Sequence, residues 1–428
     1  MTGVVTILAL SFFGLLLLGM PLAFVLGLTS LVVFLFQGNI PLDIIPQRMI
    51  LGSESFALMA VPFFILAGNL MNTGGITKRI VIFANVLMGR LRGGLALADV
   101  AASMIFAGVS GSAVADATGV GSVLIPAMKK EGYHADFAAG LTAAASVCGP
   151  LIPPSIPMVV YGIIAEVSIG AMFLAGAIPG FMLGFGLMGL AYYYSVKRDY
   201  PRYGTSSLRQ IWREFLRASL ALIMPGIILG GIFSGIFTVT ESAAVAVVYS
   251  LMLSVFIYKE IHLGDILPIL KQSAIDTAVV MFIIAVAALF GWMMAITRLP
   301  QLVTQWMFSL HLGALAMLMI LNVFLLIVGC FMEAISAMII LIPLLLVPCQ
   351  ALGIDRIHLG AVIVFNLMLG LLTPPVGLCL YITGRIADVS LEEVSKAAFP
   401  FLLVGIGVLI LITIFPALTV WLPRAWLG

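Results

Sequence analysis

The chain is predicted to be an all-α polytopic membrane protein built from two inverted repeats. Of its 428 residues, 63% are hydrophobic and only 9% are charged, against about 25% charged residues in soluble domains. A soluble fold of this length could not cover its surface with so few charges, whereas lipid-facing walls need none. Apolar runs long enough to cross a bilayer alternate with short polar segments, and a Gly/Pro motif in the first half recurs in the second.

Spans are placed where about 20 mainly apolar residues run together. In the first half they are expected at 4–18, 21–37, 56–69, 137–165 and 172–196, with a linker at 38–52 and a small-residue segment at 95–130. The first run is expected to be a retained helix, since no charged n-region or A-x-A cleavage site accompanies it. In the second half, spans are expected at 218–233, 238–258, 277–296, 359–386 and 398–422, with a small-residue segment at 323–352.

The predicted domains follow from this plan. Residues 1–196 form the first repeat, 197–217 a basic cytoplasmic loop, and 218–428 the second repeat. The sequence GPLIPP at 149–154 matches GLLTPP at 370–375 with an offset of 221, which Gly132 and Gly353 share. An offset of 217 pairs LIP at 124–126 with LIP at 341–343, and also pairs Asp116 with Glu333.

The basic residues set the expected orientation. If each small-residue segment is a re-entrant hairpin, each half has five crossings (one of them by a broken helix), an odd number that inverts the second half. With both termini in the periplasm, the cytoplasmic side then holds all of the 20 Lys and Arg residues except Arg48, Arg298, Arg356 and Arg424. This matches the positive-inside rule, so the hairpin interpretation is preferred to two additional full crossings.

Broken helices at matching positions of inverted repeats are typical of secondary transporters. Proline leaves the carbonyl four residues earlier without its helical donor. Pro150, Pro153 and Pro374 would free the carbonyls of Ser146, Gly149 and Gly370. Sodium, a hard cation that prefers oxygen, would suit such groups; the alternative is a plain proline kink satisfied by a nearby hydroxyl.

Two carboxylates lie inside the small-residue segments. Asp116 follows the sequence GVSGSAVA at 108–115, and Glu333 lies within GCFMEAIS at 329–336. Charges inside apolar stretches are costly and usually functional. Each carboxylate is expected either to bind an ion or to cap a hairpin helix, and the sequence leaves both interpretations open.

These motifs resemble a known family. The sequence FAGVSGSAVAD at 106–116, LIPPSIP at 151–157, NLMNTGG at 69–75 and GLLTPPVG at 370–377 resemble the large membrane subunit of TRAP (tripartite ATP-independent periplasmic) transporters, within the ion-transporter superfamily. The likeness covers essentially the whole chain. It implies a carrier of the elevator type in the bacterial inner membrane, with hairpins and broken helices as the moving part.

The resemblance also implies sodium-driven import of an organic acid, of the sialic acid or C4-dicarboxylate class. It implies delivery by a periplasmic substrate-binding protein. It further implies a small membrane subunit of about four helices, expected here as a separate chain. No Walker motif is present, which fits transport without ATP.

The resemblance places sodium (Na+) and substrate at the hairpin turns and helix breaks. The residues implied for sodium are Ser110, Gly111, Ser112, Asp116, Ser146, Gly149, Pro150, Gly329, Glu333, Gly370 and Thr373. Substrate is expected between the two turns, on Ser110, Ser112 and Ser155, helped by helix N-termini. The offset of 217 pairs Phe331 and Met332 of the second turn with Val114 and Ala115 of the first, so the two ion sites need not be alike.

Other functions are weighed against this one. The sequence GVSG at 108–111 matches the surroundings of an intramembrane serine protease nucleophile, but none of the four His residues lies at membrane depth to act as a base, so the chain is not expected to be an enzyme. A stand-alone carrier or antiporter of the same superfamily, and a non-transporting receptor, are the remaining alternatives. No interleaved basic and aromatic patch indicates nucleic acid. The lack of a basic residue for a second carboxylate, with Arg385 near a span end, favours a monocarboxylate such as a sialic acid.

Overall fold

The structure, a computed structural model, describes residues 2–38, 40–202 and 207–427. The first half contains α1 (Thr2–Leu17), α2 (Leu22–Gln37), α3 (Ile44–Ser53), η1 (Phe56–Met59), α4 (Ala60–Thr73), α5 (Ile76–Met88), α6 (Gly94–Ser110), α7 (Ala113–Lys130), α8 (Ala135–Ser146), α9 (Ile156–Ile164) and α10 (Ile169–Lys197). The second half contains α11 (Leu208–Phe233), α12 (Val239–Met252), η2 (Leu253–Ile257), α13 (Leu263–Ile296), α14 (Leu299–Ser309), α15 (Ala314–Phe331), α16 (Ala334–Ala351), α17 (Arg356–Gly370), α18 (Leu378–Ala387), α19 (Leu391–Ile414) and α20 (Ala417–Leu427).

The predicted all-α class is confirmed. Among the described residues, eight helices are long and apolar enough to cross a membrane, and several shorter apolar helices accompany them. Large apolar side chains such as Leu17, Phe185 and Phe256 are exposed on the outside of the protein. A water-soluble surface would not carry so many of them, whereas a lipid-facing surface does.

Both small-residue segments form helix–turn–helix units. Helices α6 and α7 meet at a turn where Gly111 takes a left-handed conformation (φ 60°), and the Ser112 hydroxyl caps α7 by accepting from Ala115 N at 3.4 Å. Helices α15 and α16 meet at a turn formed by Met332 and Glu333. Glycine tolerates the left-handed turn and Ser is a favoured N-cap, so the local sequence itself specifies the first turn.

Both predicted broken helices are present. The break between α8 and α9 spans 147–155, and the break between α17 and α18 spans 371–377; each contains one cis Pro–Pro bond. The starts of α8 (Ala135) and α17 (Arg356) are related by the same offset as the two Gly/Pro motifs. The starts of α7 and α16 share that offset, so hairpin and broken helix recur together.

This spacing corrects one alignment made from sequence. Because α7 begins at Ala113 and α16 at Ala334, the N-cap Glu333 occupies the position of Ser112, not that of Asp116. By the same register, Phe331 and Met332 correspond to positions 110 and 111, not to 114 and 115. The pairing of Asp116 with Glu333 depends on the Leu-Ile-Pro match, whose offset of 217 does not hold at the turn.

Several element bounds also differ from expectation. Helix α13 begins at Leu263, well before the span expected at 277, and α14 was not predicted. The last span is divided at Pro416 into α19 and α20. Helix α3 lies inside the expected linker, and α11 begins inside the expected basic loop, where Ser207 and Gln210 form a capping box. Such caps start helices in polar sequence that hydropathy alone treats as loop.

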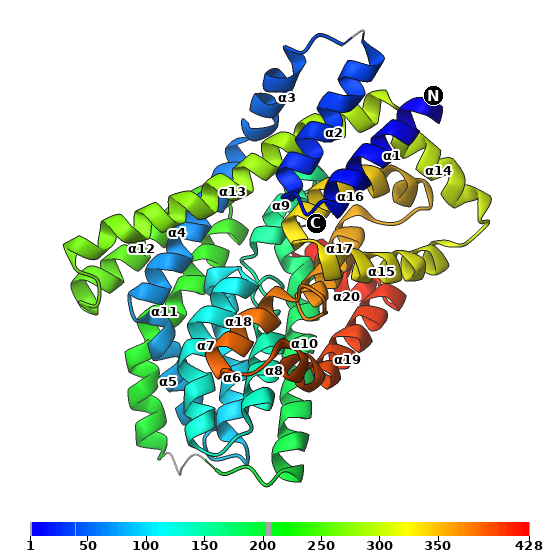
Figure 1. Ribbon diagram of the computed structural model, residues 1–428. Helices are drawn as coiled ribbons and strands as arrows, with labels where there is room; N and C mark the ends of the chain where they lie inside the picture. The colour runs from blue at the N-terminus through cyan, green and yellow to red at the C-terminus, as the bar shows by residue number, and fades with distance from the viewer. Residues whose placement is uncertain (1, 39, 203–206, 428) are drawn as a thin grey trace.

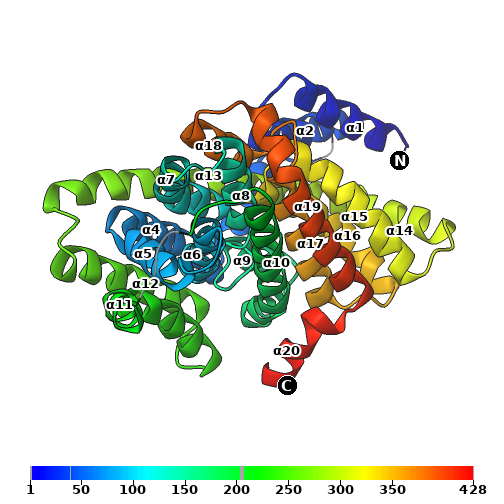
Figure 2. The same ribbon diagram turned by 90° about the horizontal axis from the view of Figure 1, so that it is seen from below.

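The helices form three groups in space (Figures 1 and 2). Helices α11, α12, α4 and α5 lie on one side, α6–α10 and α18 in the middle, and α14–α17 with α19 on the other. Helix α13 runs across the groups, against α2, α3, α4 and α16 (Figure 1). The two hairpin turns therefore approach a space that α4 and α13 close from one side.

Candidate functional site

The first hairpin turn lies directly against the first helix break. Ile156 N donates a hydrogen bond to the Gly111 carbonyl at 3.3 Å. A methyl group on Gly149 would lie 3.2 Å from the Ser112 carbonyl oxygen and 3.0 Å from that of Ser146, so a side chain there would push the turn and the break apart by a few tenths of an ångström. The turn and break residues predicted for the first sodium site are thus brought together.

The second turn and the second break are in even closer contact. A methyl group on Gly370 would lie 2.6 Å from the Cα, C and O atoms of Gly329. The Cys330 thiol donates to Thr373 Oγ1 at 3.1 Å, and Val376 N donates to the Cys330 carbonyl at 3.3 Å. The turn and break residues predicted for the second site therefore also share one place.

Two of the three carbonyls expected to be free are not free. The Ser146 carbonyl accepts from Gly149 N at 3.0 Å, and the Gly370 carbonyl accepts from both the amide and the hydroxyl of Thr373. The reason is that each helix ends in a tight turn, whose i→i+3 bonds replace the donor that proline removed. The Gly149 carbonyl receives no hydrogen bond from any described residue.

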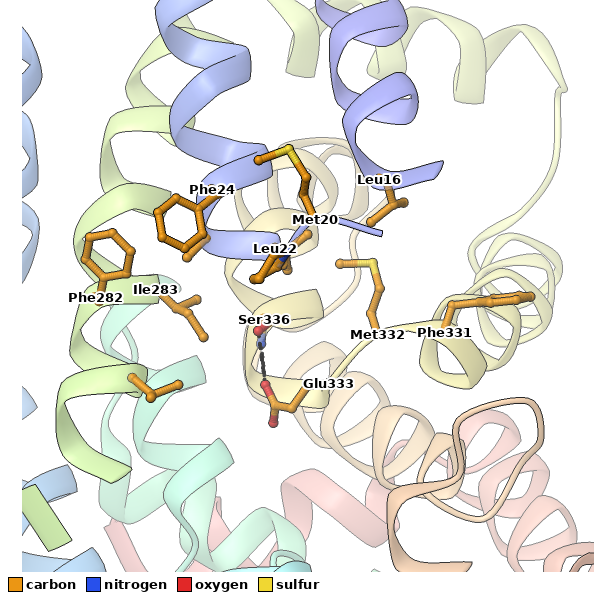
Figure 3. A pocket seen from close by; sticks show the side chains of 13 residues that line it. Leu16, Met20, Leu22, Phe24, Phe282, Ile283, Phe331, Met332, Glu333 and Ser336 are labelled. Carbon is orange, nitrogen blue, oxygen red and sulfur yellow. Dashed lines mark hydrogen bonds between the residues drawn. The ribbon is translucent and has the colours of Figure 1, made fainter. Parts of the chain in front are cut away.

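Glu333 caps its hairpin helix. Its carboxylate accepts from Ile335 N at 3.0 Å, Ser336 N at 2.9 Å and Ser336 Oγ at 3.1 Å. Figure 3 shows this carboxylate at the edge of a cavity of about 430 Å³, below a wall of Leu22, Met332 and other apolar side chains. Of the two interpretations that the sequence left open for Glu333, capping is the one seen here.

Asp116 has a different environment. It is fully buried, and neither carboxyl oxygen has a hydrogen-bond partner among the described residues. It does not cap α7, since Ser112 does. Asp99, also fully buried, is close enough to Asp116 to interact with it electrostatically; its Oδ2 accepts from Thr142 Oγ1 at 2.9 Å, while Oδ1 has no partner in the described chain.

The buried Ser103 hydroxyl faces the Asp116 carboxylate and belongs to the same cluster, but the two groups do not meet in hydrogen-bond geometry. Ser103 follows Asp99 by one helical turn on α6, so both side chains lie on the same helix face. Four buried oxygens (one of Asp99, two of Asp116 and one of Ser103) thus lack a partner within the described chain. Sequence reasoning singled out Asp116 but missed Asp99, although it too is a carboxylate in an apolar run.

A cavity of about 700 Å³ lies between the two turns. It is closed by α4, α13, the hairpin turns and the starts of α9 and α18. Its polar lining residues are Asn69, Asn72, Ser110, Ser112, Thr118, Gln272, Asp276, Glu333 and Ser336. No Lys, Arg or His is among the described residues that line it. The cavity has the size and mixed lining of a small-molecule site.

Ser155 does not line this cavity. It is fully buried, its hydroxyl caps α9 by accepting from Met158 N at 3.2 Å, and it donates to the Pro150 carbonyl. Its neighbour Ile156 reaches the cavity instead. Ser110 and Ser112, the other residues predicted for substrate, do line it.

Comparison with known proteins identifies the family of this chain. The family described as "Tripartite ATP-independent periplasmic transporter, DctM component" matches residues 9–418. The chain belongs to this family. A DctM component is a transporter subunit and not an enzyme, which confirms the family and the absence of enzymatic function predicted from sequence.

Two relatives differ in their named substrates. The chain is 41% identical to the sialic acid TRAP transporter large permease protein SiaM of Vibrio cholerae, over 97% of each chain. It is 40% identical to the C4-dicarboxylate TRAP transporter large permease protein DctM of Rhodobacter capsulatus, over 97% of this chain and 99% of that one. The percentage of sequence identity therefore does not distinguish the sialic acid class of substrate from the C4-dicarboxylate class.

A solved structure supports the fold. The YdaH transporter of Alcanivorax borkumensis is similar to this DctM component with a TM-score of 0.61 over 88% of each chain, at 14% sequence identity. At that identity the likeness concerns the fold alone. Together with the apolar helices, family membership makes the chain a multi-pass membrane protein.

One wall of the cavity in this DctM component was not predicted. Asn69 Nδ2 donates to Ser273 Oγ at 2.9 Å and to Asp276 Oδ2 at 3.3 Å, and Gln272 Nε2 donates to Asp276 Oδ1 at 2.9 Å. The signal was a polar pair spaced i, i+4 in α13 that faces a polar residue of α4. It was missed because the span was expected to start at 277, which placed Gln272 and Asp276 outside the membrane.

Proposed function

We propose that this chain is the carrier of a sodium-driven import system for a small organic acid, working by an elevator mechanism. Substrate binds in the cavity between the two hairpin turns, and sodium binds where each turn meets its helix break. A periplasmic binding protein delivers the acid, and a small membrane subunit, expected as a separate chain, completes the complex. The proposed setting is the bacterial inner membrane, with both termini in the periplasm.

The proposed architecture is a pair of inverted repeats. It is supported by the common offset at which hairpin and broken helix recur, and by the distribution of basic residues. The hairpins and broken helices pack on one another through glycine contacts, which suits a unit that moves as one body. Helices α2, α4, α12 and α13, with the linkers, would be the fixed part.

Sodium coupling rests on one observation above the others, the buried carboxylates between α6, α7 and α8. Asp99 and Asp116 are both fully buried, and three of their four carboxyl oxygens are unpartnered within the described residues. Burying a carboxylate without a compensating charge costs far more than a hydrogen bond returns. A bound cation would supply that charge, and sodium is a hard ion suited to carboxylate and hydroxyl ligands.

Uptake into proteoliposomes tests this function. The vesicles would contain the chain with the small subunit of its transport system, and the binding protein would be added with labelled sialic acid or succinate. We expect accumulation only with an inward sodium gradient. Each net positive charge carried inward adds about 2.3 kcal/mol per 100 mV, or roughly 50-fold in concentration ratio.

The variant Asp116→Asn tests the sodium site. We expect it to abolish sodium-dependent uptake or to raise the half-saturating sodium concentration at least about tenfold. Asp199→Asn is the matched control, because this carboxylate is 85% exposed and pairs with Arg92 at the surface. Equal uptake in sodium and potassium gradients would contradict sodium coupling, and uptake without the binding protein would favour a stand-alone carrier.

A further inference from the structure

The cavity of about 700 Å³ between the two turns has acidic and no basic lining residues among those described, which is unusual for a site that receives an anion. Its described lining contains two carboxylates, Asp276 and Glu333, and no Lys, Arg or His. Glu333 is occupied by the N-terminus of its own helix. Asp276, on α13, therefore remains as the lining carboxylate that is not used to cap a helix.

The two sides of the cavity offer opposite chemistry. On the hairpin side, Ser110 at the end of α6 and Ser112 at the start of α7 line the cavity. The first amide groups of a helix lack intrahelical acceptors, and its positive dipole end attracts anions. A substrate carboxylate is therefore best accommodated beside Ser112.

On the other side, Asp276 is fixed as an acceptor. One of its oxygens accepts from Gln272 at 2.9 Å and the other from Asn69 at 3.3 Å. An ionised carboxylate has about four acceptor positions, so each oxygen retains a lone pair for a further donor. Because both neighbours donate to it, Asp276 is oriented as a hydrogen-bond acceptor at the cavity.

We propose that Asp276, held by Asn69 and Gln272, is a specificity-determining residue of this carrier. It selects organic acids with one carboxylate and hydroxyl or amide donors at the other end, and it rejects dicarboxylates by like-charge repulsion. The inference rests on the proposed function of organic-acid import. The proposed role of Asp276 favours one of the two substrate classes named for relatives of almost equal sequence identity. A group that repels the wrong ligand is a common source of specificity.

The test compares two ligands that differ at one end only. Succinate carries two carboxylates, whereas succinamate has the same length with one carboxylate and one amide. Binding of each would be measured on the purified complex of this chain and its small subunit in sodium buffer. The periplasmic binding protein is left out, so that its own selectivity does not enter. We expect succinamate to bind about tenfold or more tightly than succinate.

Variants of the cavity wall should move this ratio in opposite directions. Asp276→Asn should strengthen succinate binding and reduce the preference for succinamate about tenfold. Gln272→Glu replaces a lining donor to Asp276 by a second carboxylate of the same cavity wall and should increase the preference. Asp265→Asn is the control, since Asp265 lies on α13 but does not line the cavity.

The outcomes separate the inference from the function on which it rests. Sodium-dependent binding of succinate to the wild-type chain as tight as that of succinamate would overturn the role of Asp276 and leave organic-acid transport standing. If neither these acids nor a sialic acid bind in a sodium-dependent way, the proposed function fails and the inference fails with it. The wild-type comparison decides the matter even where a variant does not fold.

Discussion

The contact between Gly329 and Gly370 gives a sharp test of the second turn–break junction. In Gly370→Ala, the new methyl group would lie 2.6 Å from three backbone atoms of Gly329. Ordinary carbon contacts are about 3.5–4.0 Å, so the hairpin turn and the broken helix must separate by about 1 Å. No flexible side chain can move aside, because the atoms in contact are backbone.

The cost can be estimated from overpacked cores. Inserting a methylene into a packed interior costs about 1–3 kcal/mol. If this cost falls on the arrangement that binds sodium, the half-saturating sodium concentration rises about 5-fold to about 150-fold. Sodium titration of uptake, with thermal unfolding of the detergent-solubilised protein in parallel, measures both consequences.

Gly407→Ala is the matched control. Gly407 lies within α19, and a methyl group there would meet no atom within 4 Å. The same substitution at an open helix position is expected to be neutral or to stabilise by about 0.5–1 kcal/mol. If Gly370→Ala showed wild-type sodium dependence and wild-type stability, the junction would not be tightly packed and the reasoning would be refuted.

Substitutions at three further positions test other parts of the structure. Ser112→Ala removes the cap of α7, which costs about 0.5–2 kcal/mol; we expect weaker substrate binding with a modest fall in melting temperature, and unchanged binding would argue against a role for this turn. Glu333→Gln keeps one capping acceptor but loses the charge at the start of α16, so melting temperature should fall less than in Glu333→Ala; an equal fall would show that charge dominates the cap. Asn366→Ala removes donors to Asn322 at 3.0 and 3.1 Å; we expect a loss of about 0.6–1.7 kcal/mol in unfolding assays with unchanged sodium dependence, and a change in sodium dependence would contradict a purely structural role.

The parts of the fold that local chemistry determines could be predicted from sequence. Glycine and serine at 110–112 and the Gly/Pro runs at 149–154 and 370–375 specify turns and breaks wherever they occur. The first hairpin turn and both breaks lie at or beside these runs, whereas the second turn, at Met332 and Glu333, does not. The pairing of each turn with its own break followed from the resemblance and is seen in the structure.

The parts of the fold and of the site that depend on tertiary contacts could not be predicted from the sequence. Asp276 faces the cavity only because α13 starts at Leu263, much earlier than hydropathy indicates, and packs beside Asn69 of α4. The carbonyls of Ser146 and Gly370 were expected to be free because proline removes one donor, but the turn that follows supplies another. Neither effect is visible in composition or periodicity, since both arise from how the chain continues beyond the apolar run or the helix end.

Because α13 is much longer than the bilayer is thick, the thickness of the bilayer affects the geometry of the cavity. A continuous helix of 34 residues is about 51 Å long, well beyond a hydrocarbon core of about 30 Å. The offset of 221 that relates the two hairpins aligns α13 with residues 42–75, where the helix is interrupted between α3 and η1, at positions 54 and 55. When a membrane becomes thinner, the interrupted pair can change its angle at the joint, whereas the part of α13 that follows Pro268 is continuous, so that its tilt changes the position of the cavity wall. The thickness of the lipid in which the protein is assayed is therefore an experimental variable that acts on the two halves unequally.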